Sequence, residues 1–184
     1  MRLLSLIAAS VVALVGLTGC ESSKARSERN PAPCPNVIVL NDAARFVTFD
    51  GAQTLDQVAW SGEITDVRYT CRYFEGSPIS GALEVDFALG RGPAAQSTRN
   101  DVTYFVAVTR KDREVIAREE FTMQANFNGA RTRLGLREKI NDLVIPRASE
   151  KTSGLNFEIV IGFVLERDQV LYNRSGKSLK FPNL

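Results

Sequence analysis

The feature that most constrains the fold is an alternation of apolar and polar residues with a period of two. It is clearest at residues 83–89, where every second residue is Leu, Val or Phe and the residues between them include Glu84 and Asp86. Such alternation is typical of strands that turn one face toward the core of an antiparallel sheet. The same pattern, or a shorter apolar run, predicts further strands at residues 37–40, 67–73, 102–108, 115–121, 137–145, 155–165 and 170–172.

The segments between these runs contain the residues that favour turns. Clusters such as "EGSPISG", "GRGPAAQSTRND" and "RASEKTSG" are rich in Gly, Pro and Ser, and "RKDRE" fits a hairpin turn. Apolar residues with helical spacing are not sustained in any window, so we expect at most single turns at residues 42–45 and 54–60. About eight strands without intervening helices predict an all-β fold, an antiparallel β-sandwich in the style of immunoglobulin or fibronectin type III domains. A small β-barrel is the alternative.

Composition limits the classes of function. The 23 Lys and Arg residues nearly balance the 21 Asp and Glu residues, which leaves a net charge of +2 and no general attraction to nucleic acids. Histidine is absent, and with it the commonest metal ligand and the usual general base near neutral pH. The serines have no G-x-S-x-G setting. We therefore expect a protein that is not an enzyme, with no cofactor, no metal and no nucleic-acid partner.

The first 19 residues have the features of a secretory signal peptide. Arg2 supplies the positive charge, and Leu3 to Leu17 form an apolar stretch of about 15 residues. As a helix this stretch would rise about 22 Å, which is short of the roughly 30 Å hydrocarbon core of a bilayer. A permanent membrane span is therefore the weaker interpretation.

The signal ends on a motif that predicts lipid attachment. Residues 17–20, Leu-Thr-Gly-Cys, resemble the lipobox of bacterial lipoproteins. This resemblance implies cleavage before Cys20, a thioether-linked diacylglycerol on its sulfur and further acylation of the new amino terminus. Two or three acyl chains anchor a protein durably to a membrane. Position 21 is Glu rather than the Asp that marks inner-membrane retention in enteric bacteria, so the resemblance favours the outer membrane, with the protein facing the periplasm.

The three cysteines then divide into one anchor and one pair. If Cys20 carries lipid, Cys34 and Cys71 remain in an oxidising compartment, where we expect them to form a disulfide. On the chain-entropy estimate this bond would stabilise the fold by about 4 kcal/mol. Its spacing does not match the inter-sheet bond of antibody domains. We expect it to attach the start of a domain at residues 36–184 to its sheet, after a lipidated, flexible tether at residues 20–35.

Two groups of charged residues have both a functional and a structural interpretation. The basic stretch at residues 131–139 would suit the phosphates of lipids or polyanions, but a solvated strand whose charges limit aggregation is favoured. The acidic pairs, Glu84 with Asp86 and Glu119 with Glu120, could serve acid–base chemistry or bind a cation. Because strands place such residues on the polar phase, we expect the first pair to face solvent.

A second resemblance concerns the whole chain. The order "CP", "C-x-Y", "V-x-F-x-x-G-x-G-P-A" and "YNRS" resembles small uncharacterised lipoproteins of Gram-negative bacteria, which implies no activity. Our hypothesis is a lipid-anchored, non-enzymatic envelope module that binds an envelope protein or polymer. The alternative is a small-ligand carrier or sensor with an apolar pocket of several hundred Å³ inside a sandwich or barrel.

Overall fold

The computed structural model describes residues 33–74, 76–111, 114–149 and 151–180. Within these ranges the chain forms eight strands, a short α-helix and four 3-10 turns. The strands are β1 (Asn36–Val39), β2 (Arg45–Phe49), β3 (Val58–Arg72), β4 (Ile79–Arg91), β5 (Arg99–Arg110), β6 (Val115–Asn126), β7 (Arg133–Ile145) and β8 (Phe157–Phe163). The helical elements are η1 (Asn41–Ala43), η2 (Leu55–Gln57), η3 (Gly154–Asn156), α2 (Arg167–Arg174) and η4 (Lys177–Lys180).

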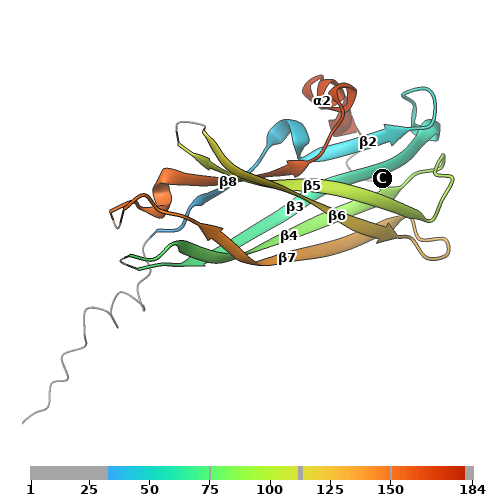
Figure 1. Ribbon diagram of the computed structural model, residues 1–184. Coiled ribbons are helices and arrows are strands. Elements are labelled where there is room, and N and C mark those ends of the chain that lie inside the picture. The colour runs from blue at the N-terminus through green and yellow to red at the C-terminus, as the bar shows by residue number, and fades with distance from the viewer. Residues whose placement is uncertain (1–32, 75, 112–113, 150, 181–184) are drawn as a thin grey trace, which may run out of the picture.

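The strands form two sheets that pack face to face (Figure 1). In the sheet that we call sheet A the order is β1-β8-β5-β6, and in sheet B it is β2-β3-β4-β7. Neighbouring strands are antiparallel except for β1 and β8, which are parallel. The predicted all-β, antiparallel β-sandwich is therefore confirmed, and its two separate sheets distinguish it from the barrel.

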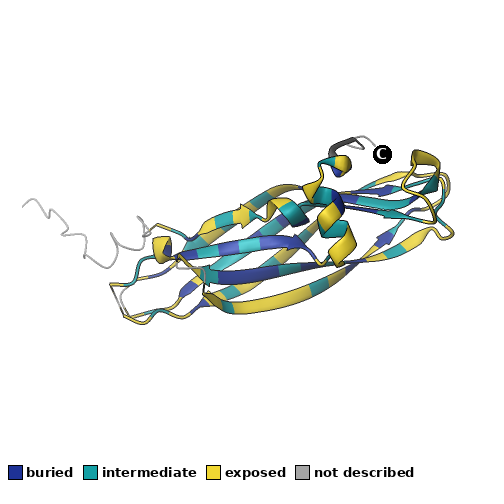
Figure 2. Cartoon of the chain, turned by 90° about the horizontal axis from the view of Figure 1, so that it is seen from above, coloured by how far each residue is buried: buried dark blue, intermediate teal, exposed yellow. Residues whose placement is uncertain are grey.

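The hydrophobic core lies between the two sheets and follows the period-two pattern. On β4, every second residue from Leu83 to Leu89 is no more than 3% exposed. Phe87 reaches toward sheet A, where its ring centroid lies 5.0 Å from that of Tyr104 and 5.7 Å from that of Phe163. Figure 2 shows the result as strands on which buried and less buried residues alternate. Aromatic rings from both sheets therefore meet in the middle of the sandwich.

All the strongly alternating runs contain strands, and several strands extend beyond their predicted ends, whereas β8 is shorter than the predicted 155–165 because Leu155 lies in η3 and the strand ends at Phe163. β3 begins at Val58 rather than at residue 67. The alternation did not predict this first half, because a bulge at Thr65 changes which residues of the strand are buried. Before the bulge the even-numbered Gly62 and Ile64 are buried, and after it the odd-numbered residues face inward. A single alternating pattern therefore recognises only the second half of this strand.

The predicted last strand at residues 170–172 is wrong, because this segment lies in α2. The helix begins with a capping box, in which the Gln169 side chain accepts the backbone N–H of Glu166 at 2.9 Å. Three residues of alternation are too few to separate a strand from one face of a short helix. Tyr172 points to the sheet and is 8% exposed. No helix in the described ranges is long and apolar enough to cross a bilayer.

The sequence pattern did not predict strand β2, because both faces of this strand are covered. Phe46 points into the core, and its ring centroid lies 4.9 Å from that of Phe163. Val47 packs instead against Val58 and against Tyr172 of α2. A strand that is covered on both faces has no polar phase, so the alternation that marks the other strands is missing.

Candidate functional site

The residue that the sequence singles out, Cys20, lies outside the described residues. Its lipid attachment therefore stays a prediction, as do the signal peptide and the tether up to residue 32. The first described residue is Pro33, and from there the structure shows how the chain is held.

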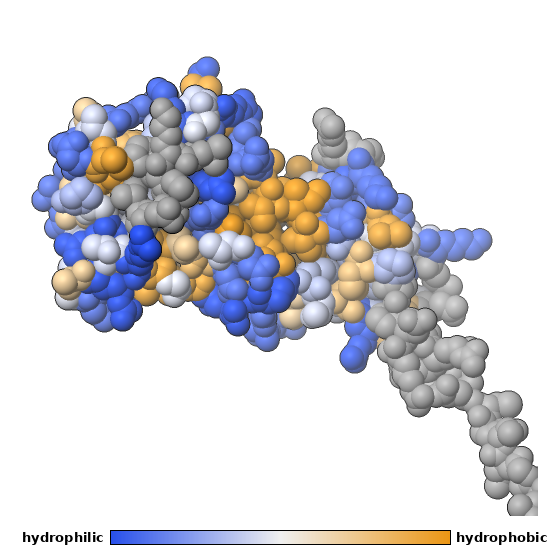
Figure 3. Space-filling model, turned by 180° about the vertical axis from the view of Figure 1, so that it is seen from behind, coloured by the Kyte–Doolittle hydropathy of each residue, from blue (hydrophilic) through white to orange (hydrophobic). Residues whose placement is uncertain are grey.

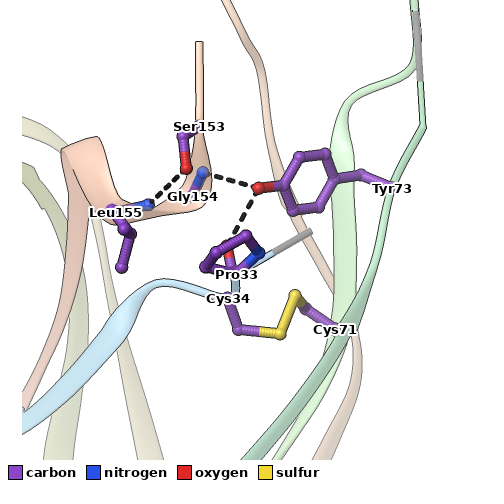
Figure 4. Close-up of a disulfide and its surroundings, with 7 residues drawn as sticks. All are labelled: Pro33, Cys34, Cys71, Tyr73, Ser153, Gly154 and Leu155. Carbon is purple, nitrogen blue, oxygen red and sulfur yellow. Dashed lines mark hydrogen bonds between the residues drawn. A yellow bond between two sulfur atoms is a disulfide. The ribbon is translucent and has the colours of Figure 1, made fainter. Parts of the chain in front are cut away.

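Cys34 and Cys71 form the predicted disulfide, with their Cα atoms 5.8 Å apart (Figure 4). Cys34 lies just before β1, which is an edge strand of sheet A. Cys71 lies near the end of β3, a 15-residue strand in the interior of sheet B. The bond therefore joins the two sheets and attaches the first described residues to an interior strand.

A buried tyrosine also attaches the first described residues to the sandwich. Tyr73 is 4% exposed, and its hydroxyl donates a hydrogen bond to the carbonyl of Pro33 at 2.9 Å. The same hydroxyl accepts the backbone N–H of Gly154 at 2.8 Å (Figure 4). A Cβ atom at position 154 would lie 2.3 Å from the Pro33 carbonyl oxygen, so a larger residue requires a backbone shift. Three segments that are far apart in the sequence thus meet where the tether would join the sandwich.

Arg147 completes a cluster that also contains the Cys34–Cys71 disulfide, Tyr73 and Gly154, and we call this cluster the tether-end brace. Its guanidinium carbon lies 4.9 Å from the centroid of the Tyr73 ring. The guanidinium donates to the backbone carbonyls of Phe74 at 2.6 Å, Ser77 at 2.7 Å and Thr152 at 3.2 Å. Hydrogen bonds from a charged donor are stronger than those between neutral groups. The brace therefore fastens the β3–β4 turn to the segment between β7 and β8.

The first acidic pair and part of the basic stretch meet on the outer face of sheet B. Asp86 on β4 accepts from Arg137 on β7 at 2.6 Å and 2.9 Å, and from Arg68 on β3 at 2.9 Å. Glu84 accepts from Lys139 at 3.0 Å. These contacts form a ladder of ion pairs across three strands, which agrees with the solvated-strand interpretation of these charges.

The ladder stabilises the charged form of its carboxylates. Hydrogen bonds from Arg137 and then from Arg68 lower the pKa of Asp86 to about 2. A hydrogen bond from Lys139 is the largest cause of the lowered pKa of Glu84. Carboxylates that are held ionised in this way serve the pairing of strands and are poor proton donors near neutral pH.

We predict that Arg137→Gln raises the pKa of Asp86, because it removes the largest of the interactions that lower this pKa. In the wild type the folded pKa lies below the unfolded value of about 3.9, so the stabilisation by Asp86 is present above about pH 4. It is lost as the pH falls through about 2. Titration of the Asp86 carboxyl carbon by NMR measures the change. The control, Lys139→Gln, removes the same charge from the same strand but contacts Glu84. Equal effects of the two variants would contradict this assignment.

An apolar slot opens between β6 and β7, the edge strands of the two sheets, which approach each other at one end and diverge toward the other (Figure 1). Its volume is about 210 Å³. The apolar residues that line it are Val106, Val108, Ala117, Phe121, Ile140, Leu143 and Val144. Glu119, Asp142 and Arg118 also line the slot, so two carboxylates and one guanidinium border its apolar surface.

Other parts of the surface are also hollowed or apolar. A hollow of about 300 Å³ crosses sheet B; it is lined by small residues such as Ser61, Ala88, Gly90 and Gly135 and by the charged residues Arg45, Glu63 and Arg133. The rear face of the molecule has a compact apolar patch between hydrophilic regions (Figure 3). Within the described ranges, no group of three or more His, Cys, Asp or Glu residues is placed to hold a metal ion.

The structure separates the second acidic pair of the sequence. Glu120 points away from the slot and pairs with Arg118 at 2.6 Å, whereas Glu119 lines the slot. Sequence reasoning did not find this slot, although one signal was present: Glu119 stands on the same phase of β6 as the half-buried Phe121 and the buried Met123. A carboxylate on the inward phase of an edge strand marks a place where the core reaches the surface.

Comparisons with known proteins add little to this description. No protein-family model matches the chain, and no curated protein matches it. Among solved structures, the chain is similar to the variable (V) domain of the AgI/II polypeptide BspA of Streptococcus agalactiae. The identity is 14%, the TM-score is 0.19, and the match covers 66% of this chain and 74% of that chain. At this TM-score the likeness supports no argument about fold or function.

Proposed function

We propose that this protein is a lipid-anchored component of the cell envelope whose β-sandwich is a non-enzymatic interaction module. Cys20 would carry the lipid at the outer membrane, and the sandwich would face the periplasm and bind an envelope protein or polymer. The observation that carries the proposal is the tether-end brace, which fastens the chain at the point where a membrane tether would pull.

The brace changes which strand bears a pull from the membrane. Without it, a force on Pro33 would act on β1, which is held by a four-residue parallel pairing at the edge of sheet A. The disulfide passes this force to Cys71 on β3, which pairs with β4 over almost its whole length. The hydrogen bond from Tyr73 to the Pro33 carbonyl acts in the same direction. Such reinforcement suits a sandwich that hangs from a lipid anchor.

The length of the tether sets the range of the module. Thirteen residue steps separate position 20 from position 33, so the tether reaches at most about 45 Å when fully extended. This segment is polar and carries charges of both signs. The sandwich would therefore work close to the membrane, on partners at the same membrane or in the adjoining layer of the envelope.

Cys20→Ala tests the anchor, because it removes the sulfur that would carry diacylglycerol. We expect the variant to move from the membrane fraction to the soluble periplasmic fraction, and to lose incorporation of an alkyne-labelled fatty acid. Ser22→Ala, two residues further along, is the matched control and should stay in the outer-membrane fraction of a sucrose gradient. A Cys20→Ala protein that remains in the membrane would refute the lipid anchor.

Crosslinking in intact cells tests the second half of the proposal. A lipid-anchored interaction module should give a defined crosslinked product with a specific envelope component, whose yield falls when Cys20→Ala releases the protein from the membrane. A protein that stays monomeric under several crosslinking conditions would count against the interaction module while leaving the anchor in place.

A further inference from the structure

The apolar slot between β6 and β7 is bordered by a bulge on each of its two strands. On β6 the extra residue of the bulge is Ile116, next to the lining residue Ala117. On β7, Asn141 and Asp142 together oppose a single residue of β4, next to the lining residue Leu143. Bulges bend a strand and re-aim its side chains, and they are frequent beside functional sites. The slot therefore has, on both of its strands, a feature that is common beside functional sites.

The slot has the size and the lining of a site for one apolar group. Val106 and Val108 of β5 are buried at its floor, and Val144 at its rim is 56% exposed. A closed apolar cavity of about 150 Å³ is large enough to bind benzene. A volume of about 210 Å³ therefore accommodates the ring or branched chain of one large side chain.

The charged residues that line the slot are two carboxylates, Glu119 and Asp142, and one cation, Arg118. Neither Glu119 nor Asp142 makes an ion pair with another described residue. Arg118 lines the slot but is engaged by other partners, because it pairs with Glu120 and lies over the ring of Phe105. This charge pattern complements a cation beside the apolar group.

Beyond the residues that line the slot, Glu138 stands on the inward phase of β7, between Leu136 and Ile140. It lies close enough to Tyr104 that its charge adds to burial in raising the pKa of this phenol to about 12. The acidic character of the opening thus extends beyond the slot and along the β6–β7 edge.

From this geometry we propose that the slot binds an extended segment of a partner protein that carries one large apolar side chain flanked by Lys or Arg. The apolar side chain enters the slot, and the flanking cations pair with Glu119 and Asp142. The backbone of the segment lies along the edge of β6 or β7, whose outer N–H and C=O groups have no strand beside them within the described sheets. This inference rests on the proposed function, because it names the class of partner for the interaction module.

A labelled peptide tests the site directly. The probe is the fluorescein-labelled peptide KVKFKVK, and its anisotropy is measured with the full mature chain bearing Cys20→Ala. The matched control peptide, EVEFEVE, has the same apolar residues with the opposite charge. We expect saturable binding of the basic peptide alone, and binding that weakens with added salt because the rim contacts are exposed. Absence of binding at millimolar peptide, or equal binding of both peptides, would overturn the proposal.

Variants then locate the binding. Glu119→Gln with Asp142→Asn should weaken binding about tenfold, since two exposed ion pairs are lost. Ala117→Trp should abolish it by filling the slot. Asp56→Asn is the control, because it removes one exposed carboxylate from η2, away from the slot, and it should leave the affinity unchanged. Equal weakening by Asp56→Asn would show attraction by overall charge and refute the slot. If Ala117→Trp does not fold, the affinity of Glu119→Gln with Asp142→Asn decides whether the peptide binds at the slot.

Two other occupants are distinguished by the same set of variants. A concentration-dependent dimer that Ala117→Trp dissociates in sedimentation would show that a second copy fills the slot, and would overturn the proposal. Binding to phosphatidylcholine vesicles that Ala117→Trp abolishes would do the same in favour of an acyl chain. Because Cys20→Ala fractionation does not involve the slot, failure of peptide binding leaves the membrane anchor to be judged separately.

Discussion

Replacing Cys34 and Cys71 together with serine should lower the free energy of unfolding by about 4 kcal/mol. The disulfide spans a sequence separation of 37 and restricts the unfolded chain accordingly. In the folded state, its loss leaves β1 attached by its four-residue pairing with β8, by the packing of Val37 and Val39 against the core, and by the hydrogen bond of Tyr73 to Pro33. Urea unfolding of the mature chain, with Cys20→Ala in both proteins to remove lipid, measures the difference.

Reduction of the wild-type disulfide provides the matched control. A thiol reductant should bring the unfolding midpoint of the wild-type chain to that of the double serine variant, and should leave the variant unchanged. A loss below about 1 kcal/mol would contradict the prediction. It would mean that the hydrogen bonds of the brace, rather than the covalent bond, hold the start of the sandwich.

The strands that sequence analysis found are those that bury one face and expose the other. On β4 the residues of one phase are buried and Glu84 and Asp86 occupy the other, so the pattern is visible without tertiary information. The pattern fails where the structure breaks this condition. A bulge at Thr65 changes the phase of β3, and α2 covers the second face of β2 at Val47.

The disulfide could be predicted, but the rest of the brace could not. Cysteine count and compartment are properties of the sequence, and once Cys20 is assigned to lipid they leave one possible pair. Tyr73, Arg147 and Gly154 come from separate segments and carry no signal of their own. Their meeting depends on the strand order, which a single sequence does not reveal.

The same reason explains why the slot and the ladder were missed as units. The ladder requires β4 to pair with β7, although two strands of the other sheet, β5 and β6, lie between them in the chain, and this pairing brings Arg137 to Asp86. The slot requires the edges of the two sheets to lie together, so that Glu119 and Asp142 share one opening. In both cases the residues were visible as charges, and their partners were set by topology.

Phe87→Ala should cost about 3–5 kcal/mol, the range for deletion of a buried aromatic side chain. Phe87 is 2% exposed and extends from sheet B to rings of sheet A, with centroids 5.0 Å away at Tyr104 and 5.7 Å away at Phe163. Its removal leaves a cavity that a close-packed core fills only in part. The difference is measured by urea unfolding at pH 7, and the slope of the transition should stay the same because the fold is unchanged.

Phe105→Ala is the matched control, because it deletes the same side-chain atoms from the outer face of sheet A, which points away from the core. Phe105 is half-buried, and the guanidinium carbon of Arg118 lies 4.7 Å from its ring centroid. Its loss should cost about 1–2 kcal/mol, the combined contribution of partial burial and one exposed cation–π contact. If both variants lost the same amount, the rings between the sheets would contribute no more than surface packing. The two sheets would then be held together mainly at their ends, by the brace and by the segments that connect them.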